Sequence, residues 1–491
     1  MSLPLFFSDA FGVSPSVIEE YGAFNISIYN DLPIFIDPFL LFNSEKPEYQ
    51  TIHSEMIRYL VFLKGIAQQG QPKQGILDAL FTFPEIKENW MGFSIEGNAG
   101  KGLGRSFAKS IVNGFNGIIR DFGTETISES SHIEKICLLQ PGVGRDFISD
   151  FTLNMALGYI AKFTESFALA HIPAGQRKRI PIRRSFFNYE TGTWVVGYFD
   201  LPIYNQRHVL LCPSDILTKD SAWINSRDLI GHFDGVVESL PNEVLREQVS
   251  DYFSKKLSEY DEVNQEEYEE CVRKTLSEWP ALIDYYIKGK EDDGERAVSV
   301  ASEKVGFVSS VFVENVASLI KNHLDPSSFG GMPQSTYDEA MARLLFLKDV
   351  IENKGGHKLF WVKDQCIDRE SDLQILYRFT WMSTASVVSR EVNDGRGPVD
   401  FMVSRGAVDK TLVEFKLAKN TKLKQNLQKQ CEIYEMASDS TGPSIKAIFY
   451  FSCEQKSKVD RILEELNLTE DKNIVLIDGR NDNKPSGSNA A

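Results

Sequence analysis

The chain has 491 residues, of which 42% are hydrophobic and 25% are charged, and its formal net charge is −16. This length exceeds what one ordinary core supports, so we expect two or three globular domains in a soluble protein. No apolar run is long enough to cross a bilayer, and the N-terminus lacks the basic flank of a signal peptide, which favours a cytoplasmic protein without membrane contact. The six cysteines and seven histidines lack zinc-ligand spacing, which argues against a zinc site or a disulfide framework.

Residues 1–245 are expected to form a larger N-terminal region of mixed α and β structure, because short apolar runs alternate with turns that contain glycine and proline. Residues 51–68 and 151–170 have the apolar spacing of helices. Residues 194–204 and 208–217 are typical of two strands with a turn between them. No motif assigns this region an activity, and we expect it to sense or position something for the rest of the chain.

Two motifs in this region carry basic residues. Segment 97–106 (GNAGKGLGRS) combines alternate glycines with two basic residues, which suggests a loop that cradles an anion, although a plain flexible loop has the same composition. Segment 177–184 (RKRIPIRR) holds five basic residues. We therefore expect Arg177, Lys178 and Arg179 to contact the phosphates of a nucleic acid.

Acidic residues in the same region have both reactive and structural interpretations. Segment 142–154 places Arg145, Asp146 and Asp150 around an expected helix start, where the acids would bind a metal or accept an arginine. A helix cap with an internal ion pair explains the same pattern. Asp37 lies in a strongly apolar stretch and is expected to cap the segment that follows it.

The C-terminal third, residues 335–478, forms the clearest unit of the chain. A charged helical segment at 246–334 precedes it and ends in a linker rich in glycine, proline and serine, and a polar tail at 479–491 follows it and is expected to be disordered. Its helices and strands are expected at 335–353 (helix), 369–383 (helix), 386–392, 399–404 and 410–418 (strands), 422–437 (helix), 445–452 (strand), 455–467 (helix) and 473–478 (strand). This order predicts a mixed sheet flanked by helices. The expected core consists of Leu344, Leu345, Leu373, Leu376, Val399, Phe401, Leu412, Phe415, Ile448 and Phe449.

Two carboxylates and a lysine fall on neighbouring strands of this unit. Glu414 and Lys416 lie two apart, so the alternation of a strand places both side chains on one face. If the preceding strand pairs with theirs, Asp400 comes to lie beside them. Such carboxylates bind a hard divalent cation, and the lysine can orient or deprotonate a water and stabilise charge on a phosphate. An edge hairpin with a surface salt bridge would show the same three residues.

The sequence PVD at 398–400, followed by EFK at 414–416, resembles the PD-(D/E)xK signature of the restriction-endonuclease-like nuclease superfamily. A valine between the proline and the aspartate departs from the motif. The resemblance implies that Asp400 and Glu414 bind Mg²⁺ or Mn²⁺ and that Lys416 is the catalytic lysine.

Three further residues extend the resemblance over residues 335–478. Glu370, in the helix before the strands, resembles the acidic residue that these nucleases often carry there, which implies a further metal ligand. Gln430 and Tyr434 resemble the Gln-x3-Tyr pattern that often follows the motif, which implies a catalytic role for Gln430. Glu391 is either an acid next to the metal or the end of an exposed strand.

The resemblance implies an endonuclease that hydrolyses phosphodiester bonds, with DNA favoured over RNA. Long chains with such a domain at the C-terminus resemble prokaryotic restriction or anti-phage defence effectors, so a homo-oligomer or a protein partner in a defence system is compatible with it. Lys419, Lys422 and Lys424 are expected to contact phosphates, unless they belong to a solvated helix face. Two alternatives stay open: a nucleic-acid-binding module that kept the fold without cleavage, and an enzyme with its chemistry around Arg145 and Asp146.

Overall fold

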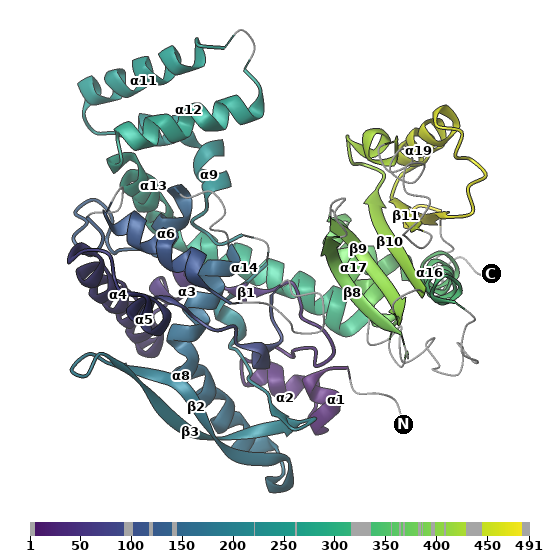
Figure 1. The fold of residues 1–491 in the computed structure, drawn as a ribbon, viewed down its shortest axis with the longest axis horizontal. Helices are drawn as coiled ribbons and strands as arrows, with labels where there is room; N and C mark the ends of the chain where they lie inside the picture. Colours follow the sequence, from purple (N-terminus) through teal and green to yellow (C-terminus); the bar gives the residue numbers. More distant parts are fainter. Residues whose placement is uncertain are drawn as a thin grey trace.

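The fold, taken from a computed structural model, combines helices and strands in an N-terminal and a C-terminal lobe (Figure 1). The structure describes residues 5–92, 102–116, 121–139, 145–219, 221–260, 263–315, 335–354, 356–362, 365–366, 369–381, 384, 386–393, 398–406, 409–428 and 444–483. The expected mixture of α and β structure is confirmed. Among the helices of these segments, none combines the length and the apolar character that a membrane span requires.

The N-terminal lobe is organised around α8 (Arg145–His171), which confirms the helix expected at 151–170. The helix expected at 51–68 is α4 (Pro47–Gln68), which packs against α8. The smaller elements before residue 145 are α1 (Phe7–Phe11), α2 (Pro15–Glu20), β1 (Phe35–Ile36), α3 (Pro38–Phe42), α5 (Gln74–Ile76), η1 (Leu77–Phe81), η2 (Lys87–Asn89), α6 (Arg105–Asn116) and α7 (Glu134–Leu139). Asp37 caps α3 as expected, because its side chain accepts a hydrogen bond from the Phe39 backbone N–H.

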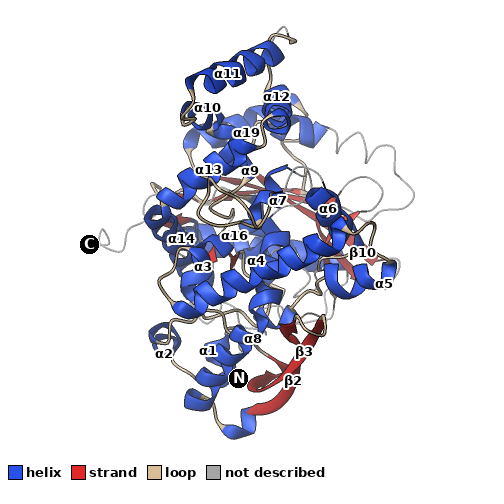
Figure 2. Cartoon of the chain, turned by 90° about the vertical axis from the view of Figure 1, so that its left-hand side faces the viewer, coloured by secondary structure: helices blue, strands red, loops and turns tan. Residues whose placement is uncertain are grey.

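A long antiparallel ribbon of β2 (Arg177–Asn188) and β3 (Thr193–Tyr204) lies along α8 (Figures 1 and 2). The strand expected at 194–204 is confirmed by β3, and a short 3-10 helix, η3 (Ala174–Gln176), precedes β2. The strand expected at 208–217 is wrong, since only β4 (Arg207–His208) pairs with β3.

The prediction of a strand at 208–217 is wrong for a physical reason. The apolar residues at 209–212 are buried, but successive backbone N–H groups bond to different elements and so form no continuous ladder: that of Val209 to Pro202 in β3, that of Leu210 to Glu88 in η2, and that of Leu211 to the Thr164 hydroxyl on α8. Their hydrophobic character therefore indicates that they are buried, but not that they form a strand. The 3-10 helix η4 (Ser214–Ile216) follows, and β5 (Leu217–Thr218) then pairs with β1.

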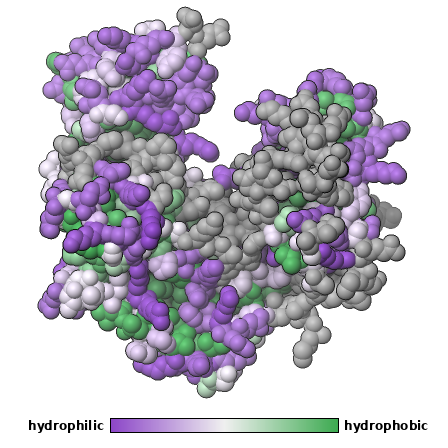
Figure 3. All heavy atoms as spheres, viewed as in Figure 1, coloured by the Kyte–Doolittle hydropathy of each residue, from purple (hydrophilic) through white to green (hydrophobic). Residues whose placement is uncertain are grey.

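The remainder of the N-terminal lobe is helical, as expected for residues 246–315. Its helices are α9 (Ser226–Gly231), α10 (Phe233–Glu238), α11 (Glu243–Leu257), α12 (Gln265–Glu278), α13 (Ala281–Asp292), α14 (Gly294–Val308) and the π-helix η5 (Ser309–Asn315). Their shared core includes Phe39 and Leu40, so these helices pack on the first part of the lobe. The α11–α12 pair contributes buried residues to that core and lies at the end of the lobe, and its outer surface is strongly hydrophilic (Figure 3).

The C-terminal lobe contains a five-stranded mixed sheet in the order β12-β11-β10-β9-β8. Strands β8, β9 and β10 are antiparallel to one another, whereas β10, β11 and β12 run parallel. The lobe consists of α16 (Thr336–Asn353), η7 (Gly356–Phe360), β6 (Trp361–Val362), β7 (Gln365–Cys366), α17 (Glu370–Phe379), β8 (Val387–Asn393), β9 (Pro398–Arg405), β10 (Asp409–Leu417), β11 (Ser444–Tyr450), α19 (Cys453–Glu465) and β12 (Ile474–Asp478). The predicted order of elements is confirmed; the helix expected at 422–437 is helical at 423–428, and its remainder lies outside the described residues.

Helices cover the sheet on both faces. On one face, α16 and α17 contact β10, and their apolar residues share a core with Phe401 and Phe415. On the other face, α19 packs on Ile448 and Tyr450. The expected core is correct for most of its members, but Leu345 is wrong because it lies 47% exposed on the outer side of α16. The side chain of Val399 lies outside the described residues, as does the expected linker at 325–334.

The two lobes meet at α17. The Phe379 ring stacks on Tyr29, with 6.1 Å between centroids, and Arg378 lies over the same tyrosine ring. The ammonium of Lys219 lies 2.7 Å from a carboxylate oxygen of Asp372, and both side chains are buried. The helix that carries Glu370 is thus held from the N-terminal lobe as well as from its own sheet.

Candidate functional site

Strand β10 presents Glu414 and Lys416 side by side at its C-terminal end. Their spacing of two places both side chains on the face of the sheet that α19 covers. Only 6% of the Glu414 side chain and 12% of the Lys416 side chain are exposed. Burying a charged group costs free energy unless the group is paired and hydrogen-bonded. We therefore expect further charged or polar groups around Glu414 and Lys416.

Asp400 joins them because the β9–β10 ladder ends next to it. The last registered pair is Phe401 with Val413. Beyond that point, Asp400 Oδ2 accepts a hydrogen bond of 2.6 Å from the Phe415 backbone N–H. Its Oδ1 accepts one of 2.7 Å from Gln374 Nε2. The Asp400 carboxylate thus takes the place of a backbone carbonyl as the acceptor for β10, and hydrogen bonds hold both of its oxygens.

Glu370 arrives from the first turn of α17. Its Oε1 accepts a hydrogen bond of 3.1 Å from the Leu417 backbone N–H. Two alternate N–H groups of β10, those of Phe415 and Leu417, therefore bond to carboxylates. Hydrogen bonds of this charge-assisted kind are stronger than those between neutral groups, so they hold the acids in place.

Lys416 lies at the centre of this arrangement. Its Nζ is 3.8 Å from one carboxylate oxygen each of Glu370, Asp400 and Glu414. Burial lowers the pKa of Lys416, but the three carboxylates outweigh this effect and the net direction is upward. The lysine therefore stays protonated near neutral pH, which favours charge stabilisation over proton abstraction.

The donors around Lys416 fit a hard divalent cation in their chemistry, since all are carboxylate oxygens. A further acceptor is available, because Gln374 Oε1 is buried and has no hydrogen-bond partner in the described part of the chain. However, no three His, Cys, Asp or Glu side chains of the described segments are already placed as a metal-ligand group. The acids now surround an ammonium, so a cation would have to enter beside Lys416.

The other expected site residues lie elsewhere. Gln430 and Tyr434 fall outside the described residues, and so does the side chain of Glu391. Lys419, Lys422 and Lys424 are exposed just after β10, and Lys424 pairs with Glu465 at 2.7 Å. In the N-terminal lobe, Arg177, Lys178 and Arg179 lie on β2, where Arg179 pairs with Asp200 at 3.1 Å. Helix α8 begins at Arg145 as expected, although the side chains of Arg145 and Asp146 are not described.

Two residues near the site were not anticipated. Gln374 lies four residues after Glu370, a spacing that places both on one face of α17 and could have indicated its role. Lys446 on β11 is the register partner of Glu414 and is buried. Its position depends on the parallel β10–β11 pairing, which no local pattern reveals.

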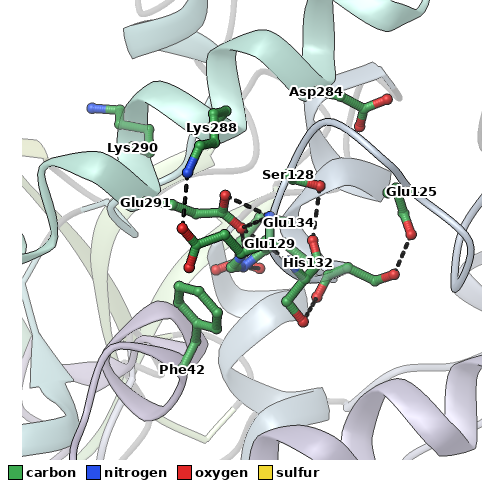
Figure 4. Close-up of polar contacts among 12 residues, drawn as sticks. Phe42, Glu125, Ser128, Glu129, His132, Glu134, Asp284, Lys288, Lys290 and Glu291 are labelled. Atoms are coloured by element: carbon green, nitrogen blue, oxygen red, sulfur yellow. Dashed lines mark hydrogen bonds and ion pairs between the residues drawn. The ribbon is translucent and has the colours of Figure 1, made fainter.

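Sequence reasoning also missed a buried cluster of ionisable groups in the N-terminal lobe (Figure 4). His132 Nε2 lies 3.0 Å from Glu291 Oε1, and the Glu291 carboxylate also accepts hydrogen bonds from the backbone N–H groups of Glu129 and Ser130. Glu134 is fully buried, and its burial raises its pKa well above the usual range. The cluster joins α7 to α13, which makes it a structural tie between the two parts of the lobe.

Comparison with known families assigns no activity to the chain. Residues 12–225 match the family described as Domain of unknown function (DUF8370), and residues 336–453 match the one described as Domain of unknown function (DUF8371). No curated protein and no solved structure matches the chain. The second match contains Glu370, Asp400, Glu414 and Lys416, so the whole candidate site falls within one family domain.

Proposed function

We propose that this chain is a metal-dependent nuclease that hydrolyses phosphodiester bonds, with DNA as the favoured substrate. The observation that supports the proposal best is the convergence of three carboxylates on one buried, protonated lysine. Charges gathered at the end of an apolar strand cost folding free energy, which a catalytic task would explain. The role of a prokaryotic restriction or anti-phage defence effector, acting as a homo-oligomer or with a protein partner, belongs to the same proposal.

Each residue has a distinct role in the proposed reaction. Asp400, Glu414 and Glu370 would hold Mg²⁺ or Mn²⁺. The metal, when bound, would polarise the phosphate and lower the pKa of a water. Lys416 would donate to a phosphate oxygen and stabilise the charge that develops on it. Gln374 fixes Asp400 through its amide N–H and leaves its Oε1 free to accept from a water or from the substrate.

The competing proposal is a nucleic-acid-binding module without cleavage. It is favoured by the position of Lys416, whose ammonium already satisfies the acids that would otherwise bind a metal. In that case, the cluster would be a structural element in which Lys416 offsets part of the charge of the three carboxylates.

One assay separates the two proposals. The full chain would be incubated with supercoiled plasmid, linear duplex and RNA in magnesium, manganese or EDTA, and binding would be measured in EDTA on the same preparations. The nuclease predicts cleavage that requires the divalent ion and that Asp400→Asn abolishes. Binding in EDTA without cleavage under any metal condition would support the inert module.

A further inference from the structure

A second candidate site lies in the N-terminal lobe, in a pocket of about 600 Å³. Its walls come from residues 82–84 and Ile86, the start of α6, the middle of α8 and the irregular centre of β2. The last of these is a register shift between Ile182 and Phe186, within which Arg184 adopts a positive φ of 59°. Such a bulge redirects side chains, and here it brings Arg183 and Arg184 to the pocket.

Three guanidinium groups line this pocket. Arg183 is exposed, and no hydrogen bond or ion pair involves it within the described residues. Arg184 donates hydrogen bonds to the backbone carbonyls of Thr82 and Ala79, at 2.6 and 3.3 Å. These acceptors are uncharged, so the hydrogen bonds do not neutralise the guanidinium. Arg105 alone pairs with an acid, Asp78, through two hydrogen bonds. The described residues that line the pocket include no acid, so Arg183 and Arg184 give it an excess of positive charge.

The start of α6 adds a second source of positive potential. The 12-residue helix begins at Arg105, and the Ala108 N–H bonds to the carbonyl of Gly104, so the first N–H groups of the helix have no partner within it. Gly102 has a φ of +63°, and a Cβ there would lie 2.4 Å from the Glu85 backbone nitrogen. Glycine is thus required for the close approach that sets this helix end against residues 83–85.

A buried amide points to a ligand independently of these charges. Asn154, on α8, lines the pocket and is only 2% exposed. Its Nδ2 donates to the carbonyls of Pro84 and Asp150, at 2.9 and 2.8 Å, which fixes the orientation of the amide. Its Oδ1 has no hydrogen-bond partner in the described part of the chain. A buried acceptor left in this state destabilises the fold, and a donor group on a ligand would remove that cost.

We propose that this pocket binds a phosphate-bearing ligand that also offers a hydrogen-bond donor to Asn154. The arginines and the helix start would hold the phosphate, and Asn154 Oδ1 would accept from an amino or hydroxyl group. The phosphate of a free nucleotide and that of a nucleic-acid strand share this chemistry. The site is separate from the cluster around Lys416 and does not depend on the nuclease proposal.

A second pocket was the other candidate for a phosphate site, and the balance of charge among its residues argues against it. It measures about 520 Å³ and also contains basic residues. There, Lys290 lies 2.7 Å from Asp228, and Arg296 lies 3.6 Å from Asp293. Its cations are matched by their own acids, so it carries no comparable excess of positive charge.

The test is calorimetric titration of the full chain in EDTA with three probes: inorganic pyrophosphate, AMP and a single-stranded 12-mer oligonucleotide. We expect at least one probe to bind with a dissociation constant below about 1 mM. Arg183→Gln should weaken that binding about tenfold or more, the range of a lost charge-assisted contact. Arg227→Gln, an exposed arginine on α9, is the matched control and should leave binding unchanged.

Asn154→Leu tests the hydrogen-bond donor of the proposed ligand separately from its phosphate. It should weaken AMP or the oligonucleotide more than pyrophosphate, which has no base or sugar donor. Binding of AMP alone would identify a nucleotide as the source of the phosphate, and preference for the oligonucleotide would identify a strand. Absence of binding by all three probes, or equal effects of Arg183→Gln and Arg227→Gln, would overturn the proposal. Melting curves on the same preparations exclude loss of the fold as the cause.

Discussion

A lysine among three acids is the most informative residue of the C-terminal lobe. Lys416 is largely buried, and its pKa is raised by the carboxylates that surround it. A protonated lysine in that position can lower the cost of negative charge on a phosphate, but it cannot take a proton from a water. The function of the site therefore depends on the charge of Lys416 and not on its basicity.

The first prediction concerns this charge. Lys416→Met should reduce metal-dependent cleavage by roughly 10²–10³-fold, the effect of losing one donor that stabilises transition-state charge. Lys410→Met is the matched control, since Lys410 lies on the same face of β10 at its other end and is exposed. Cleavage rates and melting temperatures of both variants provide the measurement. Equal activity of the two variants would remove Lys416 from the reaction.

The second prediction concerns Asp37, whose burial raises its pKa to about 6 from an ordinary value of 3.8. The folded state then binds the proton more tightly than the unfolded state. The stability gained from this proton is complete below about pH 4 and is lost as the pH rises through 6, by on the order of 3 kcal/mol. Asp37→Asn should therefore gain stability relative to the wild type between pH 4 and pH 7. Denaturant unfolding at several pH values would measure the free energy of unfolding of both proteins. A difference between the two that does not change with pH would contradict the prediction. Glu134 has a raised pKa too, chiefly through burial and also through the charge of Asp37, so the substitution should lower the pKa of Glu134 as well.

At the scale of elements, α17 decides the geometry of the site. Its first turn supplies Glu370, its next turn supplies Gln374, and Asp372 between them reaches the other lobe. Local patterns predicted this helix and the strands β8 to β12, because apolar periodicity and turn residues are local properties. They also placed Glu414 and Lys416 on one face. They could not predict that the Asp400 carboxylate takes the place of a strand partner, since that depends on where the β9–β10 ladder ends.

The third prediction concerns the segment that follows β10. Lys422→Glu should weaken nucleic-acid binding and reduce the salt slope by about 0.9 if one duplex phosphate contact is lost. Lys424→Glu should have a smaller effect, because Lys424 already pairs with Glu465. Sequence preference should not change in either variant, since phosphate contacts do not read bases. Affinities measured over a range of salt concentrations would test this, and an unchanged slope for Lys422→Glu would show that this lysine merely faces solvent.

At the scale of the whole molecule, the two lobes form one structure. A single apolar core runs from Leu5 to Ile477, and the buried Lys219–Asp372 pair lies where the lobes meet. Nothing in the sequence near Lys219 suggests this contact, because 153 residues separate the partners. The same holds for Arg105 and Arg183, which only the tertiary fold brings to one pocket.

The fourth prediction concerns a fragment that begins near residue 330. It contains the whole sheet with α16, α17 and α19, so it should fold alone, but with lower stability than in the full chain because it loses its part of the shared apolar core. It lacks Lys219 and the ring of Tyr29, so α17 should be held less firmly and cleavage per enzyme should be slower than in the full chain. Circular dichroism and cleavage rates on one substrate would show this. Equal rates would mean that the N-terminal lobe contributes nothing to the reaction.

The last prediction isolates the ion pair within the full chain. Lys219→Met removes the cation and leaves the Asp372 carboxylate buried, which should destabilise the protein by on the order of 3 kcal/mol. The double variant Lys219→Met/Asp372→Asn removes the charge as well, so most of that stability should return. Cleavage should follow the same order, because Asp372 lies between Glu370 and Gln374 on the helix that holds the site. Stability and cleavage would be measured on both variants; if the double variant is no more stable and no more active than the single one, the ion pair does not couple the N-terminal lobe to the candidate site.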